Sequence, residues 1–387
     1  LYLYIMEYCT QKRRENNMED LTNLRAQIDN IDQRMADLFC QRMQAVGKVA
    51  TFKKERGLPV LDPDREENLI AKNTQRVDDA ILRSYYTNFI KHTMKLSRQY
   101  QHRLLEGMRI AYCGAEGAFA SIATKRIFPD GCRVPYGDFK DAYEAVVKGD
   151  CDCAVLPIEN SYAGEVGQVM DMLFAGSLYV NGIYDLPLDQ NLIGLPGTKK
   201  GDVQQVVSHP QALEQCFSYI KNNGFSQTQY ANTALAAQYV KQCGNKHIAA
   251  IASDETADLY GLEIIERKIN EDRQNTTRFA VFSRAVNAQF GPKANNHFIM
   301  VFTVGNEAGM LASALDIIGK YGFNMRTLRS RPMKGLMWQY YFYVEAEGDI
   351  DSDNGKAMVK EISSCCDKLK VAGTFQSKTI EKEEIEL

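Results

Sequence analysis

The first hundred residues carry apolar side chains at spacings of three, four or seven, which is the period of an amphipathic α-helix. The pattern is formed by Leu21, Leu24, Ile28, Ile31, Met35, Leu38, Val46 and Val49. It predicts one long helix from Leu21 to about Arg56, which Gly57 and Pro59 end. A second helix is expected to begin near Asp62, and a third to run from about Asp79 to Leu105. This region therefore predicts an all-helical domain.

The length of the first helix predicts a partner chain. A helix of about 36 residues is roughly 54 Å long. A single small domain cannot bury an apolar stripe of that length. We therefore expect a homodimer or a higher homo-oligomer.

From Met108 to about Arg284 the pattern changes to short apolar runs that alternate with helical stretches, which is typical of an α/β domain. The strands are expected at Arg109 to Tyr112, Cys153 to Leu156, Gln205 to Val207, His247 to Ile251 and Phe279 to Phe282. A polar linker follows, and then a strand, a helix, two strands, a helix and a last strand. Their order is the ferredoxin-like arrangement. The ranges are His297 to Val304, Ala308 to Tyr321, Phe323 to Arg331, Trp338 to Glu347 and Gly355 to Lys368, before the last strand.

These patterns predict a multi-domain protein, which the length of 387 residues also favours. The expected parts are a tail (1–17), an all-helical domain (18–106), a two-lobed α/β domain (107–285), a linker (286–296), an α+β ferredoxin-like domain (297–378) and a charged tail (379–387). Because Met18 precedes the clean helical pattern, we expect the natural protein to begin there, with residues 1–17 being added or upstream sequence.

Composition narrows the choice of partners and of compartment. Hydrophobic residues make up 45% of the chain and charged residues 25%, which is ordinary globular usage. The formal net charge of -3 gives no reason to expect nucleic acid or a membrane as a partner. The ten cysteines show no metal-ligand spacing, and the chain shows no export signal, so we expect reduced thiols, a cytoplasmic protein and no metal.

The predicted first helix carries cations that could bind a small dianion. Arg42 and Lys53 differ by about 20° around the helix and about 16 Å along it, so they share a face. A solvated charged face is the alternative. Arg25 is about 25 Å from Arg42 and about 100° away in rotation, so we expect it to serve a site on a partner chain.

The pattern of these residues resembles the all-helical chorismate mutase family over nearly all of residues 18–106. The matching positions are Leu24-Arg25, Ile28-Asp29, Asp32, Arg42, Val49, Lys53, Pro59-Val60, Asp62, Asp64-Arg65-Glu66 and Ser97 to Gln101. The resemblance implies that Arg42, Lys53 and Arg65 form one site, which Arg25 enters from the neighbouring chain. It also implies polar substrate contacts by Asp62, Glu66, Ser97 and Gln101. In the expected rearrangement, Lys53 and Gln101 would stabilise negative charge on the breaking ether oxygen.

In the middle domain, four segments in this order resemble prephenate dehydratase over about residues 107–285. They are Gly114 to Ser121, Leu156 to Ser161 with Gly164, Ser208 to Leu213, and Asn275 to Phe279. The first is expected to be a tight strand-to-helix turn rather than a phosphate cradle. Thr277 is the expected hydroxyl donor to the departing oxygen, and Arg278 the cation near a carboxylate. The expected orienting groups are Asn160, Ser161, Ser208 and Gln211, whereas His209 is expected to be structural.

The C-terminal part resembles an ACT domain, a module that commonly binds amino acids. The matching positions, which are the expected effector contacts, are Gly309, Met310, Leu311, Ser330, Arg331 and Pro332. Arg329 stands where relatives have glutamate, which leaves the effector and the sign of regulation open. Dimerisation without an effector is the alternative.

Taken together, the resemblances imply a bifunctional enzyme of phenylalanine biosynthesis that needs no cofactor. It would rearrange chorismate to prephenate and then dehydrate and decarboxylate prephenate to phenylpyruvate, with phenylalanine as the expected effector. Two alternatives remain open at this point. The same fold could act on arogenate, or the chain could be a non-catalytic binding protein that senses amino acids.

Overall fold

The computed structural model describes residues 2–272, 274–286, 296–333, 335 and 339–380. The chain divides into two compact units, Leu1–Gly107 and Met108–Leu387. Within the residues described, no helix is both long enough and apolar enough to cross a membrane.

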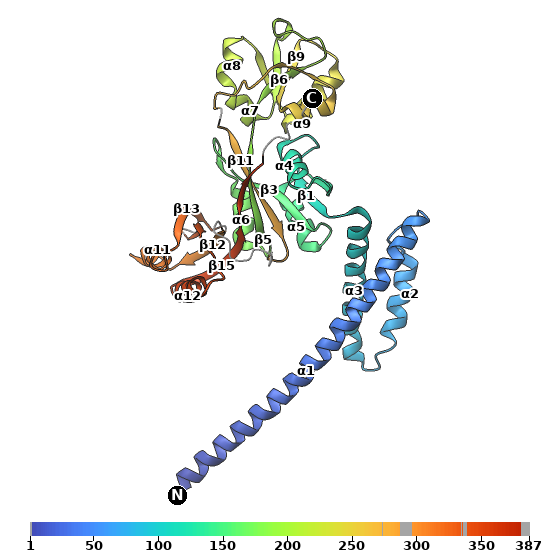
Figure 1. Cartoon of the computed structure of the whole chain (residues 1–387), viewed down its shortest axis with the longest axis vertical. Coiled ribbons are helices and arrows are strands. Elements are labelled where there is room, and N and C mark those ends of the chain that lie inside the picture. Colours follow the sequence, from blue (N-terminus) through green and yellow to red (C-terminus); the bar gives the residue numbers. More distant parts are fainter. Residues whose placement is uncertain (1, 273, 287–295, 334, 336–338, 381–387) are drawn as a thin grey trace. The chain divides into compact units, whose positions relative to one another are not determined.

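The first unit consists of the three predicted helices, α1 (Tyr2–Glu55), α2 (Pro63–Thr74) and α3 (Ala80–Glu106) (Figure 1). The carboxylate of Asp62 caps α2 by accepting from the Arg65 amide at 3.1 Å. The carboxylate of Asp79 caps α3 in the same way. One boundary differs from the prediction: α1 begins at Tyr2 instead of Leu21. Residues 2–20 contain neither proline nor glycine, so nothing in that stretch stops the helix.

The apolar stripe of α1 is exposed in the isolated chain. Leu24, Ile28 and Leu38 are 55%, 57% and 62% exposed. Exposed apolar surface of this extent is costly in water and marks a site of protein association. The oligomer expected from the sequence would cover this stripe, and it stays a prediction.

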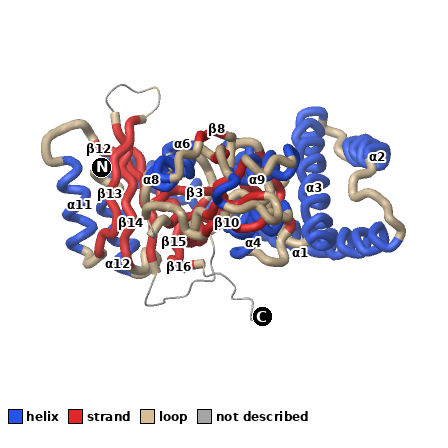
Figure 2. The backbone as a smooth tube through the Cα atoms, turned by 90° about the horizontal axis from the view of Figure 1, so that it is seen from above, coloured by secondary structure: helices blue, strands red, loops and turns tan. Residues whose placement is uncertain are grey.

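The second unit contains two sheets, and the larger one includes strands of the C-terminal part as well as those of one predicted lobe. The strands are drawn in red in Figure 2. The larger sheet has eleven strands, four of which come from the C-terminal part: β12 (His297–Val304), β13 (Asn324–Pro332), β14 (Tyr340–Glu347) and β15 (Cys366–Phe375). The strand order is β13-β14-β12-β15-β5-β11-β3-β1-β2, with β16 beside β5 and β4 beside β3. Its central elements are β1 (Arg109–Cys113), α4 (Phe119–Ile127), β2 (Cys132–Tyr136), α5 (Phe139–Lys148), β3 (Cys153–Asn160), β4 (Gly164–Glu165), α6 (Gly167–Ala175), β5 (Tyr179–Pro187), β11 (Thr276–Ser283) and β16 (Ser377–Thr379). All five predicted strands of the middle domain are present, and the segment Gly114 to Ala118 forms the expected turn between β1 and α4.

The smaller sheet has the order β10-β6-β9-β7-β8 and forms the other lobe. Its elements are β6 (Asn191–Gly194), η1 (Lys200–Asp202), β7 (Gln205–Ser208), α7 (Pro210–Gln215), α8 (Phe217–Asn222), β8 (Ser226–Gln229), α9 (Thr233–Cys243), β9 (Ile248–Ala252), α10 (Asp254–Tyr260) and β10 (Glu263–Glu266). The chain enters this lobe between β5 and β6 and returns between β10 and β11. The start of β11 therefore lies where the two lobes are joined.

The C-terminal part has the predicted order of strand, helix, two strands, helix and strand. Its elements are β12 (His297–Val304), α11 (Met310–Lys320), β13 (Asn324–Pro332), β14 (Tyr340–Glu347), α12 (Asp353–Ile362) and β15 (Cys366–Phe375). The second helix ends at Ile362 rather than near Lys368, because Cys366 already pairs with β12 as part of β15. Residues 287–295 of the expected linker and 381–387 of the expected tail lie outside the described residues.

The C-terminal strands pack against the central lobe as well as against their own helices. Along β12, Phe298, Met300 and Phe302 face the core under α11 and α12, whereas Ile299 and Val301 belong to the core of the central lobe. On β14, Tyr341 stacks on Phe174 of α6 with ring centroids 4.3 Å apart. The sheet is continuous, because Gly373 of β15 pairs with Val180 of β5. A Cβ on that glycine would lie 1.9 Å from the Val180 carbonyl oxygen, so the pairing requires glycine at position 373.

Candidate functional site

The three helices of the first unit enclose a cavity of about 260 Å³. It is lined by Arg42, Ala45, Val46, Val49, Lys53, Val60, Asp62, Arg65, Glu66, Leu69, Met94, Ser97, Arg98 and Gln101. Every residue expected at the chorismate mutase site is present, with the exception of Arg25. Four of the lining residues are cations and two are carboxylates, so the cavity suits an anionic ligand.

Polar contacts hold most of these side chains in place. The Arg42 guanidinium donates to the Ser97 hydroxyl, and burial lowers the pKa of Arg42. The Lys53 ammonium donates to the Val60 carbonyl at 2.6 Å. The Gln101 side chain is buried, and its Oε1 atom has no hydrogen-bond partner among the residues described. The Nε2 group of Gln101 donates one of its two hydrogens to the Ser97 carbonyl at 3.3 Å. Within the described residues, the amide therefore has both a donor and an acceptor that a ligand could use.

Arg98 lines the cavity and was not among the predicted site residues. It forms an ion pair with Glu66, another lining residue. The signal was present in the sequence, because Met94, Arg98 and Gln101 are spaced by four and three and therefore share one face of α3.

Arg25 lies outside this cavity. It is an exposed residue of α1, seventeen positions before Arg42, which places it about 25 Å away along the helix axis. The structure of one chain does not bring it to the other cations, so its expected role depends on a partner chain.

In the second unit, a buried cluster of amides and hydroxyls surrounds Asn160, at the end of β3. The Asn160 Nδ2 atom donates to the Thr277 hydroxyl oxygen and to Asn275 Oδ1, both at 2.9 Å. Asn160, Thr277 and Asn275 are 5%, 7% and 2% exposed. Strand pairing places these groups together, because Thr277 of β11 is the partner of Asn160 of β3.

The orientation of the Asn160 amide determines what the Thr277 hydroxyl can do. Asn160 Oδ1 accepts from the backbone amides of Tyr162 and Ala163 at 3.1 and 2.9 Å. A backbone amide can only donate, so the opposite end of the Asn160 side chain must be its NH₂ group. The Thr277 oxygen therefore accepts from Asn160, and within the residues described its hydroxyl hydrogen has no acceptor. That hydrogen is available for a ligand.

Two other predicted residues lie beside this cluster. Gln211 of α7 donates from Nε2 to Asn160 Oδ1 at 3.2 Å, which connects the smaller lobe to the cluster. The Ser161 hydroxyl accepts from the Thr276 amide at 3.0 Å. Gln211 and Ser161 are therefore brought to the end of β3.

Ser208 and Arg278 are directed elsewhere. The Ser208 hydroxyl donates to the Ile251 carbonyl at 2.6 Å and so joins β7 to β9. Successive residues of a strand point to opposite faces, so Arg278 points away from the side of Thr277. Its guanidinium binds Glu345 of β14 through two hydrogen bonds of 3.1 Å. His209 acts as the cap of α7, accepting from the Gln211 amide, and burial lowers its pKa.

The cluster also contains Gln215 and Gln190, which were not predicted. Gln215 Oε1 accepts from Asn275 at 3.0 Å and from Gln190 at 3.2 Å. The Gln215 Nε2 atom is buried and has no hydrogen-bond partner in the described part of the chain. The spacing of Gln211 and Gln215 by four on a short helix was the signal for a shared face.

The expected effector contacts fall at two places in the C-terminal part. Gly309, Met310 and Leu311 form the start of α11, and Leu311 lines a cavity of about 440 Å³ together with Phe342. Ser330, Arg331 and Pro332 end β13 and do not line that cavity. Arg331 instead forms ion pairs with Glu165 and Asp171 of the central lobe.

Comparisons with known proteins identify the family of each unit. The family model of chorismate mutase type II matches residues 24–102, and that of prephenate dehydratase matches residues 110–287. A bifunctional chorismate mutase/prephenate dehydratase of Escherichia coli K12 is 29% identical, and the match covers 93% of this chain and 97% of the relative. The chloroplastic arogenate dehydratase/prephenate dehydratase 2 of Arabidopsis thaliana is 31% identical over 69% of this chain and 72% of the relative.

A solved structure shares the fold of the second unit. The prephenate dehydratase from Arthrobacter aurescens, in complex with L-Phe, covers 70% of this chain and 90% of its own, with a TM-score of 0.64 and 23% sequence identity. The first unit has the helices expected of a chorismate mutase and a cationic cavity, and the second has the two lobes expected of a prephenate dehydratase and a contact between the predicted residues Asn160 and Thr277. This chain belongs to the bifunctional chorismate mutase/prephenate dehydratase family.

Proposed function

We propose that this chain catalyses two consecutive reactions, from chorismate to prephenate in the first unit and from prephenate to phenylpyruvate in the second. The observation that carries the proposal is the Thr277 hydroxyl, which is buried and oriented by Asn160 and whose hydrogen has no acceptor among the residues described. A binding protein would need neither this proton donor in the second unit nor the cationic cavity in the first. The family match over 93% of the chain supports both activities.

The mutase cavity suits a rearrangement that needs charge and shape but no nucleophile. Arg42, Arg65 and Arg98 supply donors for the two carboxylates of chorismate. Lys53 and Gln101 supply donors for the ether oxygen, on which negative charge develops as its bond to carbon breaks. Such donors accelerate the reaction because they bind the transition state more strongly than the substrate.

In the dehydratase reaction, the ring hydroxyl of prephenate leaves as water and the ring carboxylate leaves as carbon dioxide. The electron pair of the broken carbon–carboxylate bond completes the aromatic ring, and one proton is consumed. We assign delivery of that proton to the Thr277 hydroxyl, which regains a proton from solvent. Asn160, Gln211 and Gln215 orient this hydroxyl and the substrate.

We also propose a regulatory role for the C-terminal part as an ACT domain that binds phenylalanine. The L-Phe complex of the Arthrobacter aurescens prephenate dehydratase supports this assignment, as does the cavity that Leu311 and Phe342 line. A phenylalanine bound at Ser330, Arg331 and Pro332 would have to share the Arg331 guanidinium with Glu165 and Asp171.

The proposed assembly is a homodimer or a higher homo-oligomer, in which Arg25 completes the mutase site of a neighbouring chain. The exposed stripe of α1 supports it. A cytoplasmic location remains part of the proposal; the cysteines with described side chains are free thiols.

One experiment tests the two activities together. Purified protein is given chorismate, and the loss of chorismate and the formation of phenylpyruvate at neutral pH are followed in the same sample. We expect both. Accumulation of prephenate alone would refute the dehydratase assignment, and adding arogenate would then show whether phenylalanine is the product. A protein that leaves chorismate unchanged would refute the mutase assignment.

A further inference from the structure

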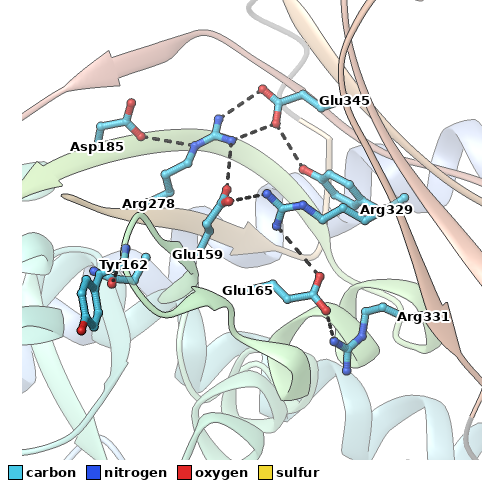
Figure 3. A network of polar contacts seen from close by, with 10 residues as sticks. Glu159, Tyr162, Glu165, Asp185, Arg278, Arg329, Arg331 and Glu345 are labelled. Atoms are coloured by element: carbon cyan, nitrogen blue, oxygen red, sulfur yellow. Dashed lines mark hydrogen bonds and ion pairs between the residues drawn. The ribbon is translucent and has the colours of Figure 1, made fainter. Parts of the chain in front are cut away.

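An ion-pair network joins the C-terminal strands to the central lobe (Figure 3). Arg278 of β11 contacts Glu345 of β14 at 3.1 Å, Asp185 of β5 at 3.3 Å and Glu159 of β3 at 3.7 Å. Arg329 of β13 also forms an ion pair with Glu159. β14 therefore contacts β11 through Glu345 and Arg278, and β13 contacts β3 through Arg329 and Glu159.

This network lies directly behind the dehydratase cluster. Arg278 and Glu159 are cross-strand partners, and the next pair along is Thr277 and Asn160. Because side chains alternate along a strand, the first pair faces the C-terminal strands while the second faces the cluster. A displacement of the strand ends at Arg278 and Glu159 must also displace Thr277 and Asn160.

The central contact of the network is buried, which makes it strong. The side chain of Glu345 is 4% exposed, and that of Arg278 is 21% exposed. Burial alone would lower the pKa of Arg278, but its hydrogen bonds to Glu345 raise it above the ordinary value. A two-pronged guanidinium–carboxylate contact fixes direction as well as distance, and neutralising one partner leaves the other charge buried.

A second anchor lies beside the first, at the N-terminus of α6. Arg331 forms ion pairs with Glu165 and Asp171. Its guanidinium lies over Gly167, where an added Cβ would come within 2.5 Å of it. The strand β13 is thereby attached to the segment that immediately follows Asn160.

We propose that Arg278 is a positioning residue of the dehydratase reaction, and that Glu345 of the C-terminal part acts through it to hold Thr277 and Asn160 in their reactive arrangement. This inference rests on the proposed dehydratase function. The C-terminal part then has a role in catalysis that needs no effector. Its charged side chains, Glu345 and Arg329, fix the positions of the ends of β11 and β3. Arg278 then binds carboxylates of the protein rather than the substrate's.

The test uses Glu345→Gln in the full-length chain, because this change keeps the shape of the side chain and removes its charge. We expect kcat for prephenate dehydration to fall about tenfold or more while KM changes less than about threefold, since small misplacements of reacting groups act mainly on the chemical step. Mutase turnover should not change. Glu345→Asp should recover part of the lost kcat, because it restores the charge with a shorter reach.

Glu347→Gln is the matched control. It lies two residues along the same strand, and it contacts Arg326 and Asn324, which are outside the network. Its dehydratase kinetics should equal those of the wild type. If Glu345→Gln prevents folding, Arg329→Gln provides the same test at a more exposed contact.

Amide hydrogen exchange provides a readout that does not need activity. Glu345→Gln should accelerate exchange at the end of β3 and the start of β11, and Glu347→Gln should not. A Glu345→Gln protein with kcat within twofold of the wild type, or with unchanged exchange at both strand ends, would overturn the proposal. If the wild type itself does not form phenylpyruvate, the proposed function fails, and the exchange result alone decides whether the network holds the cluster.

Discussion

Replacing Thr277 by valine would test the dehydratase mechanism most directly. Valine has nearly the same shape as threonine and suits a β-strand, so β11 should keep its pairing. The change removes one hydroxyl, whose oxygen accepts from Asn160 at 2.9 Å. Asn160 Nδ2 keeps its second acceptor, Asn275 Oδ1, also at 2.9 Å. The cost in folding free energy should therefore be near 1 kcal/mol, the usual value for one hydrogen bond.

The effect on the reaction should be much larger than the effect on folding. Proton donation by a positioned side chain contributes about 10²- to 10⁴-fold to a rate. This range corresponds to about 3 to 5 kcal/mol of activation free energy. Thr277→Val should therefore lower kcat for prephenate dehydration by at least about 100-fold. Mutase turnover in the same protein should be unchanged, because its site lies in the other unit.

The assay follows phenylpyruvate formation from prephenate, with chorismate loss as an internal measure of folded protein. Thr277→Ser keeps the hydroxyl and should retain most of the activity. The adjacent Thr276→Val is the matched control, because the Thr276 hydroxyl already donates to the Gln274 carbonyl at 3.1 Å. Dehydration by Thr277→Val at more than about a tenth of the wild-type kcat would refute proton donation by this hydroxyl.

The remaining predictions concern the mutase site and the packing of the C-terminal part. Lys53→Ala should reduce mutase kcat by about 10²- to 10³-fold and spare the dehydratase, whereas Lys54→Ala, on another face of α1, should change neither. If Arg25 serves a neighbouring chain, mixing the inactive Arg25→Ala and Lys53→Ala proteins under conditions of subunit exchange should restore about a quarter of mutase activity. About half of the dimers would then be mixed, and one of the two sites in each would have both native residues. No recovery would place Arg25 and Lys53 in the site of one chain. The Lys370 ammonium donates to the carbonyls of Leu173, Gly176 and Leu178, and burial lowers its pKa to about 8 from 10.5. Between these pH values the unfolded chain binds more protons there than the folded one, so the free energy of unfolding should rise with pH; thermal melts of Lys370→Met should lack this rise.

Periodicity predicted the three helices of the first unit, five strands of the middle domain and the six elements of the C-terminal part, but it did not resolve the other strands and helices of the second unit. The Asp62 and Asp79 caps occur where the second and third helices were expected to begin. The end of α12 was predicted six residues too late. There the strand β15 is selected by its pairing with β12, a long-range contact that local helical periodicity does not reveal.

The sequence predicted which candidate site residues come together where those residues lie on one helix or strand. Arg42 and Lys53 share a helix face, and both line the mutase cavity as expected. Arg278 was expected to be the cation near a carboxylate in the dehydratase site. Adjacent strand residues face opposite sides, and the carboxylate that Arg278 meets is Glu345, 67 positions away. Only the packing of the C-terminal strands on the central lobe reveals that partner.

The positive charge at position 329 is also explained by carboxylate partners within the protein. Relatives were expected to carry glutamate there, and this chain has arginine. In the structure Arg329 lies against Glu159 and, at 4.0 Å, Glu165. A glutamate at the same place would face two like charges, and that repulsion is strong where side chains are partly buried. Arginine at this position is therefore matched to the acidic ends of β3 and β4.

The reversed charge need not reflect a change of effector, because its partners are in the protein's own central lobe. Whether an amino acid can bind at β13 depends instead on Arg331, for which the ligand's carboxylate would have to compete with Glu165 and Asp171.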